Sequence, residues 1–139
     1  MKGRYSHGAN AYRNVRTTTA APYSDSLQLI QMLFSALVEA LAEAEGHMSR
    51  NNFEQKAYSL NRAIKILSGL QDSLDFDKGK ELALNLSDIY DYSRRSLLKA
   101  GIKNDLPLVR EIRRLMTEID SAWQLLPNAL NHQPVPLAS

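Results

Sequence analysis

The residues that could support acid–base or metal chemistry are few, and their spacing does not suit such chemistry. The chain has three histidines, His7, His47 and His132, and no cysteine. Carboxylate-bridged metal sites in helical bundles use inward-facing Glu-x-x-His pairs. Ala44 stands where such a pair would place a glutamate before His47, and the other two histidines lie near the chain ends. The sequence therefore predicts no metal site.

A histidine phosphotransfer domain, or another signalling helical bundle, is the alternative function in which a histidine would do chemistry. The candidate is His47, which is followed by Met48-Ser49-Arg50-Asn51 and falls near the expected end of a helix. A phosphotransfer histidine usually lies in the middle of a helix with a lysine nearby. The sequence therefore favours a surface histidine, and phosphotransfer is kept as the second hypothesis.

Other catalytic patterns are also missing from the sequence. Glu39 with Glu43, and Asp88 with Asp91, are about one helical turn apart, but they lie off the apolar faces. General acid–base groups need a cleft that shifts their pKa values, so solvated carboxylates are the better interpretation. Gly79-Lys80 lacks the upstream glycine of a phosphate-binding loop, and no serine has a glycine-flanked elbow. We predict no enzymatic activity and no cofactor.

The composition narrows the class of protein further. The chain has 139 residues, 44% hydrophobic and 23% charged, with 17 basic and 15 acidic residues, which suits one domain. A net charge of +2 argues against a nucleic-acid partner, which needs a clustered positive excess. The N-terminus does not resemble a secretory signal, and we find no apolar run of transmembrane length. We expect a soluble cytoplasmic protein without membrane insertion.

Arginines on the expected third and fourth helices could suggest a basic surface. They are Arg94, Arg95, Arg110, Arg113 and Arg114. No exposed aromatic residues alternate with them for base stacking, and acidic residues are close by in sequence. We expect exposed helix faces with local ion pairs.

Leucine and alanine dominate the apolar residues, which favours helices over strands. Four stripes of apolar residues recur at helical spacing. The first stripe contains Leu27, Ile30, Phe34, Leu37, Val38 and Leu41. The second contains Phe53, Ala57, Leu60, Ile64, Leu67, Leu70 and Leu74. The third contains Leu82, Leu86, Ile89, Tyr90, Ser93, Leu97 and Ala100, and the fourth Val109, Ile112, Met116, Ile119, Trp123 and Leu126.

Helices of about 20 residues with short connections pack antiparallel. The prediction is an all-α protein, an antiparallel up-down-up-down four-helix bundle over residues 25–127. Residues 1–24 form an N-terminal arm and residues 128–139 a flexible, disordered C-terminal tail. Asn51 is expected to cap the second helix, residues 75–79 to form a turn, and Gly101 to end the third helix in a left-handed conformation. Pro107 should lie in the first turn of the fourth helix and Pro127 should end it.

Two of the predicted helices carry more apolar residues than the core requires. Leu84, Leu98 and Ile102 fall opposite the core face of the third helix, and Leu29, Met32 and Ala36 lie away from the core line of the first. Contiguous exposed apolar patches mark interaction surfaces, and an amphipathic segment laid into a groove between helices would use them. The candidate partner-binding residues are Leu29, Met32, Leu33, Ala36, Leu84, Leu98 and Ile102. The arm, through Tyr12 and Val15, could cover this groove when no partner is bound.

Several short segments carry a family resemblance. Residues 11–15, 27–34 and 82–92, with Asn104-Asp105 and Ala122-Trp123, appear in the right order over about residues 10–125. Together they resemble the flagellin-specific export chaperones, the FliS family. The positions that match the family motifs include Asn85, Leu86, Tyr90, Tyr92 and Trp123.

The resemblance implies a cytoplasmic chaperone without a nucleotide requirement. Such a protein would bind the disordered C-terminal segment of flagellin, prevent premature polymerisation and support delivery to the flagellar type III export apparatus. In the family the N-terminal arm packs over part of the bundle and is displaced by flagellin, which fits the covering role inferred for Tyr12 and Val15. The flagellar export gate and a co-chaperone are further candidate partners.

Overall fold

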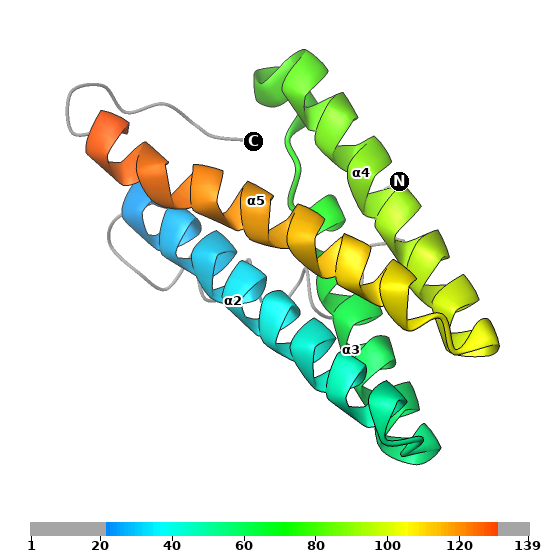
Figure 1. Ribbon diagram of the computed structural model, residues 1–139. Helices are drawn as coiled ribbons and strands as arrows, with labels where there is room; N and C mark the ends of the chain where they lie inside the picture. The colour runs from blue at the N-terminus through cyan, green and yellow to red at the C-terminus, as the bar shows by residue number, and fades with distance from the viewer. Residues whose placement is uncertain (1–21, 131–139) are drawn as a thin grey trace.

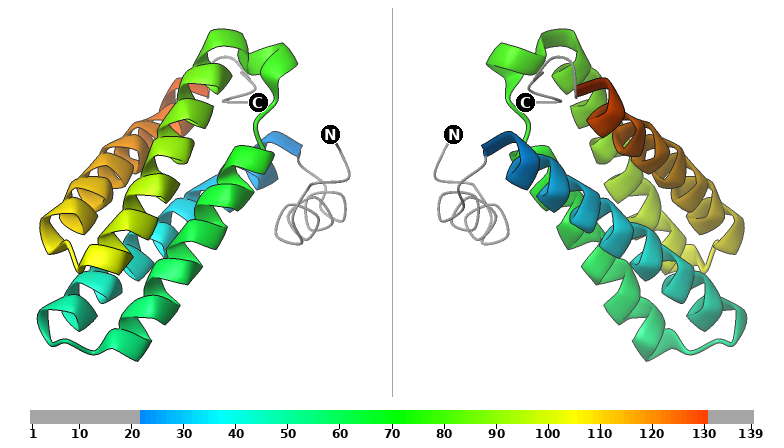
Figure 2. Two further views of the ribbon diagram at one scale, coloured as in Figure 1. Left: turned by 90° about the vertical axis from the view of Figure 1, so that its right-hand side faces the viewer. Right: turned by 90° about the vertical axis from the view of Figure 1, so that its left-hand side faces the viewer.

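Four antiparallel α-helices make up the described part of the chain. The computed structural model describes residues 22–130, with side chains for residues 27–125. The helices are α2 (Pro22–Ser49), α3 (Phe53–Asp72), α4 (Phe76–Lys103) and α5 (Leu106–Leu130), and Figures 1 and 2 show them running up and down in one bundle. The all-α, up-down-up-down prediction is confirmed. Most of the expected arm, with Tyr12 and Val15, and most of the expected tail lie outside the described residues.

Each helix packs against two neighbours, and this determines which faces remain free. α2 contacts α3 and α5, and α4 also contacts α3 and α5. α2 and α4 do not contact one another among the described residues, so they occupy diagonal corners of the bundle. Their outward faces therefore lie on opposite sides of the molecule.

The core consists largely of the predicted stripes. Its fully buried members include Phe34, Leu37 and Leu41 of α2, Leu67 and Leu70 of α3, Tyr90 and Leu97 of α4, and Ile112 and Met116 of α5. The Phe34 and Trp123 rings pack with their centroids 6.4 Å apart, which ties α2 to α5. Burial of these side chains is the main favourable contribution to the fold.

Three stripe residues expected in the core are solvent-exposed instead. Phe53 is 59% exposed and Leu82 is 55% exposed, and Ala57 is also exposed. Ala57 lies to one side of the buried face of α3, which runs through Lys56, Leu60 and Ala63. Phe53 and Leu82 lie near the first residues of α3 and α4. Helical periodicity identifies the face of a helix but not the length over which a neighbour covers it.

Two helix boundaries in the first half of the chain differ from the predictions. α2 begins at Pro22, three residues before the expected start, because proline is tolerated in a first turn. Asn51 does not cap α3. It takes a left-handed conformation with φ 57° in the turn, and Asn52 is the residue that precedes the helix.

Residues 75–79 form the first helical turn of α4 rather than a free turn. The Asp75 carboxylate accepts hydrogen bonds from the backbone N–H groups of Asp77 (3.0 Å) and Lys78 (3.1 Å). The helix is then interrupted at Lys80, which has φ 46° and ψ −119°. A capped turn followed by a break therefore joins α3 to the main part of α4.

The prediction that Gly101 ends the third helix is wrong. α4 continues to Lys103, and Asn104 takes the left-handed conformation with φ 52°, a conformation that asparagine tolerates. A Cβ atom at Gly101 would lie 3.2 Å from Leu60 Cδ1, a close contact that a small shift of the Leu60 side chain would have to relieve. Pro107 lies in the first turn of α5 as predicted, but α5 continues past Pro127 to Leu130.

α2 is the most apolar of the four helices, whereas we expected no apolar stretch of transmembrane length. Residues Leu27–Ser49 of α2 are long and apolar enough to cross a membrane by length and composition, so that expectation was wrong. However, the apolar residues Phe34, Leu37 and Leu41 are fully buried among the helices of the bundle. This is the arrangement of a core helix, which meets the same length and composition criteria.

A matched pair of substitutions on α2 tests this account of the core. Leu37→Ala should lower the free energy of unfolding by about 2–5 kcal/mol, because the fully buried side chain leaves a cavity. Met32→Ala should change it by no more than about 0.5 kcal/mol, because Met32 is 65% exposed. Urea denaturation followed by circular dichroism measures both, and similar losses in the two variants would contradict the described burial.

Candidate functional site: two exposed apolar surfaces

The first apolar surface lies on α2. Met32 is 65% exposed, and Leu29 and Ala36 are partly exposed; we call these three residues the α2 surface. Met32 and Ala36 line a shallow depression of about 680 Å³, together with Gln28, Gln31, Ser35, Glu39 and, from α5, Gln124. Leu33, a further candidate, is partly buried and packs against the core. The α2 surface is therefore an apolar floor with mostly uncharged polar neighbours.

The second apolar surface lies on α4. Leu84, Leu98 and Ile102 are 57%, 55% and 85% exposed; we call these three residues the α4 surface. Leu98 and Ile102 are one turn apart, so their side chains are neighbours. Leu84 lies two heptads earlier, about 21 Å along the helix axis, with the Asp91 carboxylate at the midpoint. The α4 surface therefore has an apolar pair near one end of the helix and a separate leucine near the other.

The two surfaces do not form one groove. We expected one groove to include residues of both helices, but α2 and α4 are diagonal and do not touch within residues 22–130. α3 and α5 separate the two surfaces. A partner that contacts both must therefore extend around the bundle.

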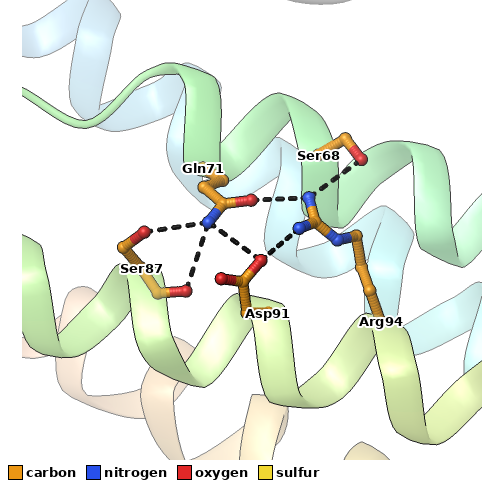
Figure 3. A network of polar contacts seen from close by, with 5 residues as sticks. All are labelled: Ser68, Gln71, Ser87, Asp91 and Arg94. Atoms are coloured by element: carbon orange, nitrogen blue, oxygen red, sulfur yellow. Dashed lines mark hydrogen bonds and ion pairs between the residues drawn. The ribbon is translucent and has the colours of Figure 1, made fainter.

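A polar network between α3 and α4 sets the orientation of the α4 surface (Figure 3). The Gln71 side-chain amide donates to Ser87 Oγ (2.8 Å) and to Asp91 Oδ1 (3.3 Å). Its Oε1 accepts a hydrogen bond from Arg94 Nη1 (2.5 Å), and Arg94 also pairs with Asp91. Because each hydrogen bond requires a specific distance and direction, the network fixes the rotation and register of α4 against α3.

A buried lysine holds the end of α4 that carries Leu98 and Ile102. Lys56 of α3 is 8% exposed, and its Nζ donates to the Gly101 carbonyl (3.0 Å) and to Asn104 Oδ1 (3.2 Å). The last carbonyls of a helix lack intrahelical partners and carry negative partial charge, which an ammonium group neutralises. The exposed Phe53 ring lies beside the same ammonium, 5.1 Å from Nζ to the ring centroid. Sequence periodicity placed Phe53, not Lys56, in the core.

The charged residues mostly join different helices. Arg113 and Arg110 of α5 both pair with Glu45 of α2, the Arg110 Nε lying 3.5 Å from Glu45 Oε1. Arg62 of α3 approaches both Glu39 (3.6 Å) and Glu43 (3.8 Å) of α2. The expectation of local ion pairs was therefore wrong for Arg110 and Arg113, because the bundle brings partners from another helix closer than the neighbours in sequence.

The residues that carry the family resemblance have mixed roles in the structure. Leu86, Tyr90 and Trp123 are core residues, 7%, 1% and 6% exposed. Tyr92 is 41% exposed and donates a hydrogen bond from its hydroxyl to Glu111 Oε2 (2.7 Å). This bond to a carboxylate is the main cause of the raised pKa of Tyr92, because it favours the neutral phenol. Asn85 is exposed, which leaves it free to contact a partner.

His47 lies in the last turn of α2 and is partly buried. Its Nδ1 is 3.4 Å from Arg50 Nη2. The histidine is therefore at a helix end beside an arginine, and not in the middle of an exposed helix face. This geometry gives no support to the phosphotransfer alternative.

Asp120 of α5 lies one helical turn before Gln124, which lines the depression. Its Oδ1 is buried and has no hydrogen-bond partner within the described part of the chain, while Oδ2 accepts from Gln124 Nε2 (3.2 Å). Burial raises the pKa of Asp120 above the usual 3.8, and the bond from Gln124 partly offsets the rise. The negatively charged form is therefore disfavoured at this position.

The fold and these surfaces define a class of protein: an all-α helical bundle that carries exposed apolar side chains on two of its helices. Comparison with known proteins identifies the family within that class. The family model described as "Flagellar protein FliS" matches residues 8–129, and the chain belongs to the FliS family. This is a family of secretion chaperones, so the prediction of a non-enzymatic protein is confirmed.

Individual relatives support the same assignment. The chain is 38% identical to the flagellar secretion chaperone FliS of Salmonella typhimurium over 124 residues, covering 88% of this chain and 92% of that protein. It is 38% identical to the FliS of Escherichia coli over 131 residues, covering 92% and 96%. The FliS of Bacillus subtilis is 28% identical over 114 residues, covering 82% and 81%.

The position of Asp120 predicts a change in how stability depends on pH. Because the pKa of Asp120 is higher in the folded state, the folded protein binds the proton more tightly than the unfolded chain does. The free energy of unfolding therefore falls as the pH rises from 3.8 through the folded-state pKa. Asp120→Asn removes the ionisable group that causes this fall in stability, so the variant should be at least as stable as the parent at pH 7. The stability of the variant relative to that of the parent should decrease toward about pH 3.5.

Thermal unfolding between about pH 3.5 and pH 7 measures the difference between Asp120→Asn and the parent. Glu118→Gln, an exposed substitution on the same helix, controls for the change in net charge. A variant less stable than the parent at pH 7 would contradict the described burial of the carboxylate.

Proposed function

We propose that this chaperone binds the disordered C-terminal segment of flagellin in the cytoplasm. Binding prevents premature polymerisation and supports delivery of the subunit to the flagellar type III export apparatus. The observation that carries the proposal is the exposure of Met32, Leu98 and Ile102 on two outward helix faces in a member of the FliS family. Neighbouring exposed apolar groups such as Leu98 and Ile102 mark interaction surfaces.

The diagonal placement of the two surfaces favours an extended client. A folded partner with one flat interface contacts one side of the bundle, whereas a disordered segment can run around it. Two amphipathic stretches joined by a linker can occupy the α2 surface and the α4 surface in turn. Each contact is weak, and together they bind more tightly because the second contact is intramolecular.

This mode of binding also explains release without nucleotide hydrolysis. Ordering a disordered client costs conformational entropy, which lowers the affinity for the area buried. An export apparatus that competes for the same client segment then shifts the binding equilibrium toward release of the client from the chaperone. Delivery of the client requires contact with the flagellar export gate, and a co-chaperone is a further candidate partner.

Charge substitutions on the two surfaces test the proposal directly. Met32→Glu and Leu98→Glu should each weaken binding to flagellin by about tenfold or more, because a carboxylate replaces an apolar contact. The double substitution should weaken it further. Isothermal titration calorimetry measures these affinities, with circular dichroism to verify the fold.

Controls separate the proposed mode from a general loss of folding. Tyr58→Glu changes an exposed residue of α3 (71% exposed) outside both surfaces and should leave the affinity unchanged. Flagellin that lacks its C-terminal segment should not bind detectably. Equal binding of full-length and truncated flagellin would refute the proposal, and unfolding of Met32→Glu would show that this residue belongs to the core.

A further inference from the structure

The first turns of α4 carry apolar side chains that no described helix covers. Leu82 lies on the same face as Leu86 and Tyr90, since the three are spaced four residues apart. Leu86 and Tyr90 are 7% and 1% exposed, but Leu82 is 55% exposed. Phe76, in the first turn, is 41% exposed. The core-facing side of α4 therefore continues beyond the end of the core.

The arrangement of the helices explains this exposure. Figures 1 and 2 show the first turns of α4 projecting beyond the end of α3. At this end of the bundle α4 lies away from α5, whereas the two helices meet at their short connection at the other end (Figure 1). Leu125, near the described end of α5, is also 68% exposed. The start of α4 and the described end of α5 thus each carry exposed apolar side chains at this end of the bundle.

We propose that residues 134–137 of the same chain, Pro134-Val135-Pro136-Leu137, occupy this open end and cover Leu82 and Phe76. α5 ends at Leu130, at the same end of the bundle as the start of α4 (Figure 1). From Leu130, Leu137 can reach about 23 Å in an extended chain. The segment that follows α5 therefore starts at the end of the bundle where Leu82 is exposed.

The chemistry of the segment matches the surface. Residues 131–139 contain no aspartate, glutamate, lysine or arginine, so the segment can cover Leu82 without burying a charge. Val135 and Leu137 supply apolar contacts, and the two prolines reduce the conformational entropy lost on docking. Residues 1–21, by contrast, carry Lys2, Arg4, Arg13 and Arg16, which are costly to place on an apolar face.

The absence of cysteine from the chain allows a specific test. Leu82→Cys introduces a single thiol, and its labelling rate by a maleimide reports how often the site is uncovered. Removal of residues 131–139 should raise that rate about fivefold. A segment that covers the site about four fifths of the time leaves it open about one fifth of the time, and truncation would leave it always open. Val135→Ser with Leu137→Ser in the full chain should raise it similarly.

Leu98→Cys is the matched control, because Leu98 is also 55% exposed and lies on the same helix at the far end. Its labelling rate should not change on truncation. Glu81→Cys provides a second reporter that keeps Leu82 in place. Emission from Trp123, the single tryptophan, should stay constant if the core remains intact.

Three outcomes would overturn the proposal. Equal labelling of Leu82→Cys and Glu81→Cys in the full and truncated chains would show that residues 131–139 do not cover the site. A rise caused by removal of residues 1–21, and not of residues 131–139, would assign the surface to the N-terminal segment. Labelling that slows with increasing protein concentration, independently of truncation, would assign it to a second copy of the chain.

Discussion

The packing of α2 between α3 and α5 is the contact on which the rest of the bundle depends. α2 supplies six of the core side chains, namely Phe34, Leu37, Ala40, Leu41, Ala44 and Met48. α4 completes the bundle by packing on α3 and α5, and in the described part of the chain it does not touch α2. Because α2 and α4 are diagonal, each presents an outward face on its own side. The core thus creates two separated surfaces as a direct consequence of its geometry.

The attachment of α4 differs in character from that of α2. Apolar burial at the interior is supplemented by the network of Gln71, Asp91 and Arg94, and by Lys56 at the helix end. Apolar contacts tolerate small rotations, whereas hydrogen bonds require specific directions. The network therefore gives α4 a defined rotation, which keeps Leu98 and Ile102 directed to solvent instead of into the α3 interface.

These features fit the requirements of a secretion chaperone. A client that must be released intact should be held by several weak contacts rather than by one tight interface, because the total affinity then falls sharply when one contact is lost. The α2 surface has mainly uncharged polar neighbours, while the α4 surface is interrupted by Asp91. The two surfaces therefore differ in the polarity of their surroundings.

The sequence by itself determined the helical class, the number of helices and most of the core, because a 3.6-residue period records which face of a helix is apolar. It also identified Met32, Leu98 and Ile102 as outward-facing. It could not give the exposure of Phe53 and Leu82, the burial of Lys56 or the choice of Asn104 over Gly101 as the left-handed residue. Those features depend on where each helix stops relative to its neighbours. Only the tertiary structure decided them, because the burial of a side chain and the pairing of a carbonyl depend on atoms distant in sequence.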